Sequence, residues 1–424
     1  MRGLLPLYRG AGRVFELAAP LWLKRRAAHR KEDPARLTER LGQFSLPRPD
    51  GPLIWVHAAS VGETVSVLPL LSALQSARPD VQILLTTVTT TAARIATERL
   101  PDGILHQYAP IDTPKAVARF LTHWQPSALL LIESELWPNM IVNAKAAGAR
   151  IAVINGRLSD KSFQNWQRFG AGRTMMDNID LVLAQGPEQA EQFRILGAEN
   201  IATPGNLKWA GTPLPVNEMK LTDLQEQLGS RPCWLAASTH EGEERQVADA
   251  HIALRQEYNH DHLLTIIVPR HPERGPAIAD DLTAMGLTVS LRSRQDLIKP
   301  ETDAYIADTL GELGTFYALT DLVFMGGSLV PKGGHNPLEA ARSRCCIITG
   351  EHQYDFKSIY NELLKSNAAI SLTGSRGLAF WINLALADPA LREATGNCAK
   401  ELVDQHKNVL PDTLDALLPL LPED

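Results

Sequence analysis

The chain has 424 residues, of which 44% are hydrophobic and 21% are charged. A chain of this length exceeds one ordinary hydrophobic core, so two domains of about 200 residues each are expected, and the composition excludes extended disorder. The four cysteines follow neither a zinc-site nor a disulfide-framework spacing, which favours a reducing compartment, and the net charge of −6 excludes a general nucleic-acid binder.

The N-terminal segment is locally basic. Residues 1–31 carry eight basic residues against the single acid Glu16, whereas the rest of the chain has a net charge of −13. At about 100° per residue, its apolar and basic side chains fall on opposite faces of a helix. The apolar face contains Leu4, Leu7, Tyr8, Ala11, Val14, Phe15, Ala18 and Trp22, and the opposite face contains Arg2, Arg9, Arg13 and Glu16.

This pattern predicts an amphipathic helix over residues 1–30 that anchors the chain in the plane of an anionic membrane surface. Charges together with Pro6 and Pro20 interrupt the apolar run, so the segment lacks the roughly 20 apolar residues of a spanning helix. Two other interpretations remain open: an amphipathic helix packed on the protein's own core, and a degraded signal anchor.

From residue 53 onward, short apolar runs alternate with helical patterns, which is typical of βαβ units in a parallel sheet. Prolines and glycines dilute the pattern between residues 203 and 217. The predicted fold class is α/β, with a doubly wound Rossmann-like domain over 31–207, a linker over 208–220 and a second such domain over 221–424. The expected strands are 53–58, 81–88, 104–108, 128–132, 151–155 and 181–184, then 233–237, 263–268, 288–291, 304–307, 322–325 and 346–349. A helical region over 378–421 follows and is a candidate to pack back across the linker.

The first expected strand runs into the sequence HAASVGE over residues 57–63. Ligands of doubly wound sheets bind beyond the carboxyl ends of the strands, so a cleft between the domains is the expected site. Glu63, at the start of the following helix, is therefore a candidate general base for a substrate hydroxyl. The alternative is structural, because the helix macrodipole favours a first-turn glutamate that has no catalytic role.

Two acids end the fourth expected strand, in IESELWPN over residues 132–139. Glu133 and Glu135 are costly to bury there unless they are paired or solvated. They are candidates for aligning acceptor hydroxyls or holding a cation, or else first-turn acids before a helix that starts at Pro138. In NGRLS over residues 155–159, Arg157 is a candidate partner for one of these carboxylates or for a substrate anion.

In the second half, STHEGEE over residues 238–244 predicts a helix N-cap at Ser238 or Thr239 with acids in the first turn. The strand 263–268 runs into PRHPER, where Arg270 is a candidate for bidentate contact with a phosphate. In DTLGEL over residues 308–313, Gly311 would let a ligand approach the backbone.

The segment richest in signals is MGGSLVPKGGHNPLEA over residues 325–340. Such a glycine-rich strand-to-helix loop predicts backbone N–H groups that bind an anion such as a phosphate. A capping box with Asn336 as N-cap, Pro337 as N1 and Glu339 as N3 explains only part of the motif. The P-loop pattern and an early GxGxxG are absent, which disfavours kinases, NTPases and dehydrogenases.

Taken together, these segments resemble the 3-deoxy-D-manno-octulosonic acid (Kdo) transferases of lipopolysaccharide inner-core synthesis. The similarity extends over nearly the whole chain. The motifs occur in the order of the family: HAASVGE, IESELWPN, NGRLS, GNLK at 205–208, STHEGEE with VPRHPER, and DTLGEL with GGSLVPKGGHNPLEAA.

The resemblance implies a GT-B fold, in which an acceptor-binding and a donor-binding Rossmann-like domain face a central cleft, at the cytoplasmic face of the inner membrane. It implies CMP-Kdo as donor, the 6′-hydroxyl of a tetraacyl lipid A precursor (lipid IVA) as acceptor, and an inverting single displacement with Glu63 as general base. No metal and no cofactor are implied, and the expected partners are CMP-Kdo, the lipid A precursor and the anionic membrane surface. The implied CMP contacts are Pro269, Arg270, Leu310, Gly311, Glu312, Asn336, Pro337, Leu338 and Glu339.

Two other function classes fit parts of the sequence. A GT-B enzyme such as a nucleotide-sugar epimerase or a teichoic-acid-type transferase would share the fold and the phosphate loop, but it would not need HAASVGE together with a basic N-terminal segment. A catalytically silent scaffold would leave the intact candidate base and nucleotide residues unexplained.

Overall fold

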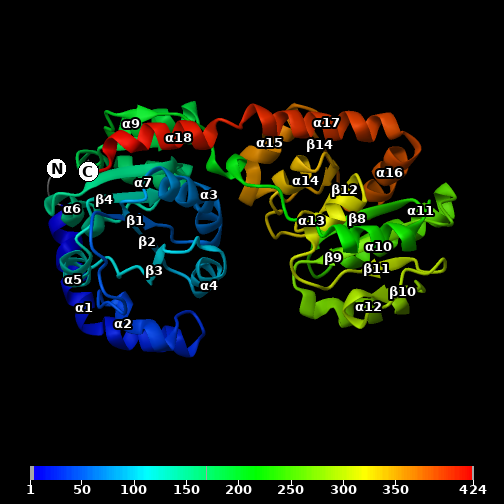
Figure 1. The fold of residues 1–424 in the computed structure, drawn as a ribbon, viewed down its shortest axis with the longest axis horizontal. Helices are drawn as coiled ribbons and strands as arrows, with labels where there is room; N and C mark the ends of the chain where they lie inside the picture. Colours follow the sequence, from blue (N-terminus) through cyan, green and yellow to red (C-terminus); the bar gives the residue numbers. More distant parts are fainter. Residues whose placement is uncertain (1–3, 169, 423–424) are drawn as a thin grey trace. The chain divides into compact units, whose positions relative to one another are not determined.

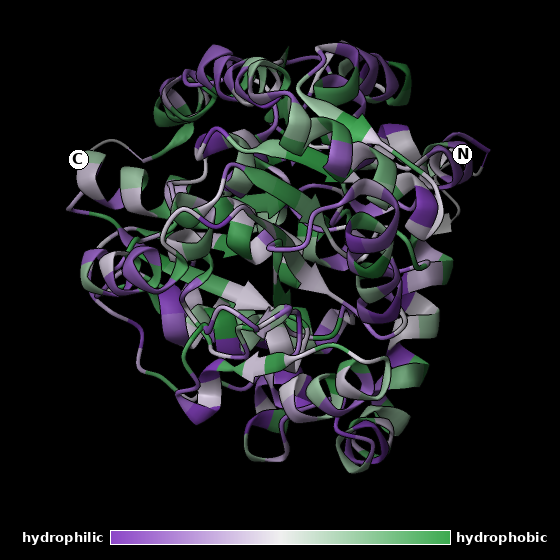
Figure 2. Cartoon of the chain, turned by 90° about the vertical axis from the view of Figure 1, so that its right-hand side faces the viewer, coloured by the Kyte–Doolittle hydropathy of each residue, from purple (hydrophilic) through white to green (hydrophobic). Residues whose placement is uncertain are grey.

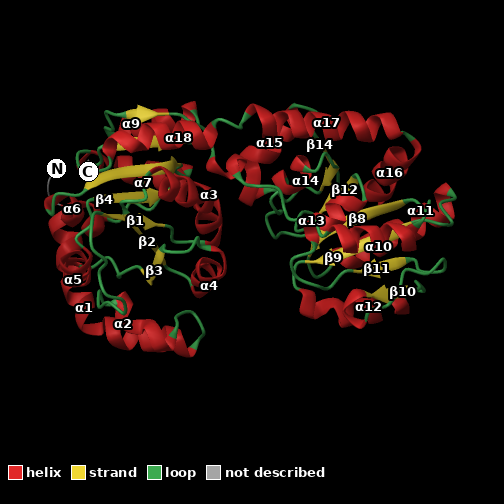
Figure 3. Cartoon of the chain, viewed as in Figure 1, coloured by secondary structure: helices red, strands yellow, loops and turns green. Residues whose placement is uncertain are grey.

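The computed structural model describes residues 4–168 and 170–422, which divide into two compact units (Figure 1). The first unit contains residues 1–211 and 406–424, and the second contains residues 212–405. Each unit is built on one parallel sheet of seven strands covered by helices on its two faces (Figure 3). The predicted α/β class with two doubly wound sheets is confirmed.

The first sheet has the strand order β3-β2-β1-β4-β5-β6-β7, with every pair parallel. All six strands expected for this half are present, and the two-residue strand β7 was not expected because it is too short to show a pattern. The strands are β1 (Leu53–His57), β2 (Gln82–Thr87), β3 (Leu105–Tyr108), β4 (Ala128–Ile132), β5 (Arg150–Gly156), β6 (Leu181–Ala184) and β7 (Ile201–Ala202).

Helices cover both faces of this sheet because successive strand residues point to opposite sides. Trp55 joins one apolar layer with Phe120 and Met140, whereas Val56 joins the other with Leu70. The helices are α1 (Leu4–Ala28), η1 (Pro34–Arg36), α2 (Leu37–Arg40), α3 (Val61–Ala77), α4 (Thr90–Arg99), α5 (Pro114–Trp124), α6 (Pro138–Ala146), α7 (Asp160–Arg168), α8 (Ala171–Met176), α9 (Pro187–Leu196), η2 (Leu207–Ala210), α18 (Val409–Leu417) and η6 (Leu418–Leu420).

The second sheet has the order β10-β11-β9-β8-β12-β13-β14, again entirely parallel. Figure 2, which colours each residue by hydropathy, shows apolar strands enclosed by helices with hydrophilic outer faces. The six expected strands are present, and the short β14 was missed. The strands are β8 (Cys233–Thr239), β9 (Leu264–Pro269), β10 (Val289–Leu291), β11 (Ala304–Ile306), β12 (Leu322–Met325), β13 (Cys346–Thr349) and β14 (Ala369–Ser371).

The helices of the second unit follow its strands in alternation, as the sequence predicts. They are α10 (Glu218–Leu228), α11 (Glu243–Tyr258), η3 (Pro272–Arg274), α12 (Gly275–Ala284), η4 (Arg292–Arg294), α13 (Leu313–Leu319), α14 (Leu338–Arg342), η5 (Tyr354–Phe356), α15 (Lys357–Lys365), α16 (Gly374–Ala387) and α17 (Pro389–Gln405).

The end of the chain does not belong to the second unit, to which residues 221–424 were assigned from the sequence. Helix α18 packs in the first unit, where Val409 and Leu417 are buried against Leu70 of α3. The His406 ring, just before this helix, stacks on Trp209 with ring centroids 4.2 Å apart. Burial of these side chains in the core of the first unit is the physical reason for the correction.

Helix α1 lies on the first unit and has apolar side chains on two of its faces. Ala19 and Leu23 are fully buried, whereas Leu7, Val14, Leu17 and Leu21 are each at least 69% exposed. The single apolar face that the sequence predicted is therefore divided between an inner face and an exposed stripe; Arg2 of that prediction lies outside the described residues. Within residues 4–168 and 170–422, no helix is both long enough and apolar enough to cross a bilayer.

Replacement of Leu417 by alanine is expected to destabilise the first unit by about 2–5 kcal/mol, because Leu417 is fully buried in its core. Urea unfolding followed by tryptophan fluorescence measures the change, with Asp415→Ala on the exposed side of the same helix as the control. Equal effects of the two substitutions would contradict the placement of α18.

Candidate functional site

The strand order of each sheet reverses direction at one point, and the motifs gather there. In the first sheet β1 lies beside β4, and in the second sheet β8 lies beside β12. The chain leaves these neighbouring strands on opposite sides of the sheet, which opens a crevice at their carboxyl ends. Glu63 follows β1 and Glu133 follows β4, whereas His240 follows β8 and Gly326 follows β12.

Glu63 lies in the first turn of α3, which Ser60 caps. The Ser60 Oγ accepts a hydrogen bond from the Glu63 backbone N–H at 3.3 Å and donates to Glu63 Oε1 at 2.8 Å. Glu63 Oε2 accepts from the Ala59 backbone N–H at 2.7 Å. The carboxylate thus folds back over the start of its own helix, as in a capping box, and is held in one orientation.

Burial raises the pKa of Glu63 to about 7, and the negative charge of Glu135 adds to this effect. The bonds from Ser60 and Ala59 act in the opposite direction but do not cancel it. A purely structural helix cap gains stability from a carboxylate that is ionised at neutral pH. Glu63 instead titrates near neutrality, which is the range expected of a general base.

Glu135 is held ionised by the neighbouring aromatic residues. Its Oε2 accepts a hydrogen bond from the indole of Trp137 and lies 3.7 Å from His57 Nε2. Burial raises the pKa of Glu135, but the contacts with His57 and Trp137 outweigh burial and leave this pKa below its usual value. His57 is fully buried at the end of β1, and its Nδ1 lies 3.0 Å from the Thr86 hydroxyl. A histidine in an otherwise apolar strand was the signal for this role, which the sequence analysis left unassigned.

Glu133 is paired as well, so the expectation that the two acids are paired or solvated is confirmed. Its carboxylate lies 3.2 Å from Lys208 Nζ. Asn155 accepts a hydrogen bond from the backbone N–H of Leu207 at 3.0 Å, which fixes the segment that carries Lys208. The motifs IESELWPN, NGRLS and GNLK therefore converge here. Arg157 forms no ion pair with a carboxylate of the described residues.

In the second unit, the glycine-rich loop after β12 binds a carboxylate of the protein itself. Glu243 accepts hydrogen bonds from the backbone N–H groups of Gly327 at 2.6 Å, Ser328 at 3.0 Å and Leu329 at 2.9 Å. It also accepts from His240 N at 2.9 Å. Glu243 is fully buried, and burial raises its pKa despite these four bonds.

The structure corrects three predictions in this part of the chain. The N–H groups at the start of the loop are occupied and are not exposed to a phosphate. Ser238 and Thr239 do not cap α11, since β8 continues to Thr239 and the helix starts at Glu243 after Gly242. The expected capping box at 336–339 also shifts by one residue: Pro337 is the N-cap of α14, although Asn336 Oδ1 still accepts from Leu338 N at 3.1 Å.

Beside this loop lies a cluster of histidines and exposed cations. The His240 and His335 rings are stacked, with their Nε2 atoms 3.0 Å apart, and His271 packs edge-on against His240. Burial and the neighbouring positive charges, Arg270 among them, lower the pKa of His240 and of His335 to about 4. Arg270 is exposed, and its guanidinium has no carboxylate partner within residues 4–168 and 170–422. The cluster is suited to an anionic ligand.

The other predicted nucleotide residues lie at the carboxyl ends of three strands of this sheet. Pro269 ends β9 beside Arg270, and Asn336 to Glu339 begin α14 after β12. Leu310 is 82% exposed, and Gly311 has a φ of 79°, which favours glycine.

The Glu312 carboxylate is already bonded within the protein. It accepts from Arg292 Nε at 2.7 Å and Nη2 at 2.8 Å and from Lys220 Nζ at 2.6 Å. The bonds from Arg292 lower its pKa to about 2. A contact from this residue to a nucleotide would therefore use its backbone.

The family model and two relatives that match this chain are all 3-deoxy-D-manno-octulosonic acid transferases. A family model described as 3-deoxy-D-manno-octulosonic-acid transferase (kdotransferase) matches residues 35–210. The 3-deoxy-D-manno-octulosonic acid transferase of Haemophilus influenzae is 34% identical over 91% of this chain and 91% of its own length. That of Bordetella pertussis is 33% identical over 98% of this chain and 97% of its own length.

A solved glycosyltransferase from Rickettsia africae has the same fold, with a TM-score of 0.57 and 12% identity over 89% of this chain and 100% of that one. At this identity the likeness concerns the fold alone, which is GT-B. The sequence identity to the full-length relatives carries the stronger conclusion: the chain belongs to the 3-deoxy-D-manno-octulosonic acid transferase family.

Proposed function

We propose that this Kdo transferase transfers Kdo from CMP-Kdo to the 6′-hydroxyl of a tetraacyl lipid A precursor, lipid IVA, by an inverting single displacement with Glu63 as the general base. The observation that carries the proposal is the Glu63 carboxylate at the reversal point of the first sheet, with a pKa of about 7. We further propose that the transfer needs no metal and no cofactor. CMP-Kdo is consumed in the reaction and therefore counts as a substrate.

In this proposal the first unit supplies the proton acceptor, Glu63. The acceptor hydroxyl gives its proton to Glu63 as its oxygen bonds to C2 of Kdo, while the bond from C2 to the phosphate oxygen of CMP breaks. Each Glu63 oxygen accepts one internal hydrogen bond and retains a free lone pair for the acceptor hydroxyl. Glu135 keeps the pKa of Glu63 raised and so makes it a stronger base than an ordinary glutamate.

The second unit holds the donor in this proposal. Arg270, whose guanidinium has no carboxylate partner among the described residues, stabilises the negative charge on the departing CMP phosphate. The loops that contain Pro269, Leu310 to Glu312 and Asn336 to Leu338 surround the nucleotide, and Glu339 binds the ribose hydroxyls. An epimerase or a silent scaffold is disfavoured by membership of the transferase family and by the intact base.

We also propose that α1 holds the enzyme at the cytoplasmic face of the inner membrane. Its exposed stripe of Leu7, Val14, Leu17 and Leu21 supplies an apolar contact, and Lys24 and Arg25 supply positive charge toward anionic lipids. The lipid acceptor resides in the same surface, so the enzyme and its acceptor meet in two dimensions.

Glu63→Gln is expected to lower kcat by about 10²- to 10⁴-fold because an amide cannot accept the proton, while CMP binding by titration calorimetry stays unchanged. The control is Glu188→Gln, which alters an exposed first-turn glutamate of α9 and should be silent. Turnover of Glu63→Gln within about tenfold of the wild type would exclude this residue as the base.

The pH dependence of kcat/KM tests the raised pKa. The base works only when ionised, so kcat/KM should rise with pH through a pKa of about 7 and level off above it. Glu135→Gln removes a negative charge next to Glu63. The substitution should lower the pKa of Glu63 and so move the rising part of the pH profile to lower pH. Glu98→Gln, on the exposed face of α4, should leave it in place. An unchanged pKa in the kcat/KM profile of Glu135→Gln would count against an electrostatic interaction between Glu135 and Glu63.

Replacement of Leu7, Val14, Leu17 and Leu21 together by glutamine should weaken binding to anionic vesicles by at least about tenfold with the fold intact. Co-sedimentation and thermal unfolding measure the two properties. The control replaces four exposed apolar residues elsewhere, Ile195, Met219, Leu297 and Phe380, by glutamine. Undiminished sedimentation of the α1 variant would refute the anchor.

A further inference from the structure

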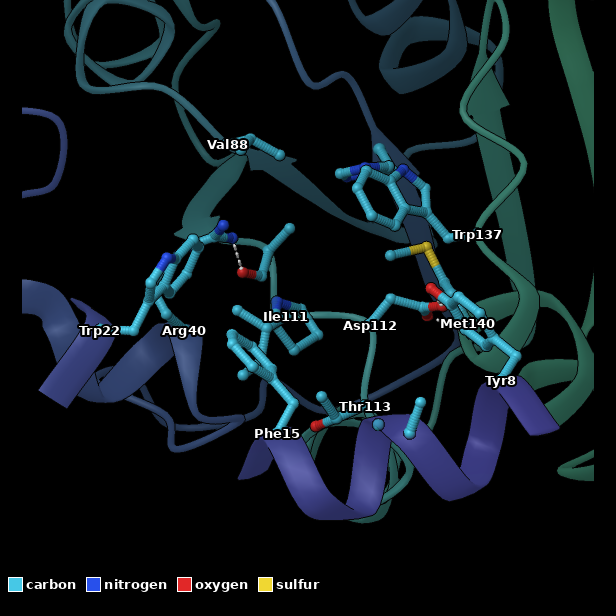
Figure 4. Close-up of a pocket in the computed structure, with 15 residues that line it drawn as sticks. Tyr8, Phe15, Trp22, Arg40, Val88, Ile111, Asp112, Thr113, Trp137 and Met140 are labelled. Carbon is cyan, nitrogen blue, oxygen red and sulfur yellow. Dashed lines mark hydrogen bonds between the residues drawn. The ribbon is translucent and has the colours of Figure 1, made fainter. Parts of the chain in front are cut away.

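The first unit contains a cavity of about 330 Å³ between α1 and the body of the unit (Figure 4). Its size lies in the range of about 300–1,000 Å³ that is usual for ligand sites. Helix α1 forms one wall, and the segment 109–113 with the start of α6 forms the other. The lining residues are Tyr8, Ala11, Gly12, Phe15, Trp22, Arg40, His57, Val88, Ala109, Pro110, Ile111, Asp112, Thr113, Trp137 and Met140.

The charges of Asp112 and Arg40 in the wall have partners within the protein. Asp112 accepts hydrogen bonds from the Tyr8 hydroxyl at 2.9 Å and from the backbone N–H groups of Asn139 at 3.0 Å and Met140 at 2.8 Å. The N-cap of α5 is the next residue, Thr113. Arg40 is paired with Glu32 at 3.3 Å and donates to the Ala109 carbonyl. Neither charge requires a charged ligand.

The side chains that face the cavity are mainly apolar. In Figure 4, Phe15 and Tyr8 point from α1 toward Ile111 and Met140. Flexible aliphatic chains fit such walls of rings and branched side chains, since every methylene that leaves water contributes favourably.

The wall of the cavity adjoins the proposed acceptor site through two of its lining residues. Both His57 and Trp137 line it, and both contact Glu135. His57 Nε2 has no hydrogen-bond partner among the described residues, although the ring is fully buried. Glu135 in turn acts on Glu63 by charge. A ligand seated in the cavity thus lies one layer of side chains away from the acids that surround the base.

We propose that this cavity binds one acyl chain of the lipid acceptor and so positions the acceptor sugar beside Glu63. The inference rests on the proposed function, because it takes the acceptor to be an acylated lipid. Helix α1 then has two separate tasks: its inner face lines the acyl site and its exposed stripe lies on the membrane.

Ala11→Phe tests the proposal, since Ala11 lines the cavity and is exposed enough to be enlarged without disturbing the core. Ala18→Phe is the matched control, because it adds the same ring at an exposed position of the same helix outside the cavity. Val88→Phe narrows the cavity from the other side and should reproduce Ala11→Phe. Thermal unfolding should be alike for all three.

Kdo transfer is measured with the tetraacyl acceptor and with its fully deacylated analogue. Ala11→Phe should raise KM for the acylated acceptor by about tenfold and alter KM for the deacylated one by less than about twofold, whereas Ala18→Phe should alter neither. Equal effects of Ala11→Phe on the two acceptors, or no effect on either, would overturn the acyl site.

A binding measurement separates this inference from the proposed function. A linear fluorescent polyene fatty acid should bind to the wild type and to Ala18→Phe, and about tenfold more weakly to Ala11→Phe. If no transfer to the lipid occurs, this difference would still establish a chain-binding cavity, whereas equal binding to the two variants would refute it. Transfer that depends on Glu63 but not on cavity size would retain the function and reject the cavity.

Discussion

In each unit, the chain leaves two neighbouring parallel strands on opposite faces of the sheet, and the position of this strand pair determines where the candidate site lies. β1 pairs with β4 in one unit and β8 with β12 in the other, and both pairs are parallel. Parallel pairing brings the strand ends together at one edge of the sheet. Residues about 70 positions apart, such as Glu63 and Glu135, become neighbours for this reason, and the charge of Glu135 adds to the effect of burial in raising the pKa of Glu63.

In the first sheet, the pKa of Glu63 depends on the charge of Glu135. Ionised Glu135 needs the partners His57 and Trp137, and its charge then opposes ionisation of Glu63. Two carboxylates in one small volume are thereby given different protonation behaviour by their surroundings. Such separation allows one acid to remain a fixed charge while the other exchanges a proton.

Patterns that act over a few residues were predictable from the sequence. The alternating apolar runs gave the strands, and a carboxylate after the first strand indicated Glu63. Contacts between distant segments were not predictable: Lys208 pairs with Glu133, and Glu243 fills the loop after β12. A glycine-rich loop has the same sequence signature whether an external anion or an internal carboxylate satisfies it, so only the fold distinguishes the two cases.

The internal carboxylate of Glu243 has a consequence for the donor binding that we propose for the second unit. Since three amides of the glycine-rich loop are held by Glu243, the loop is ordered as the chain folds and not when a nucleotide arrives. The loss of backbone entropy is then part of the folding equilibrium and does not reduce affinity. In the proposed donor site, the nucleotide therefore meets a loop that is already ordered.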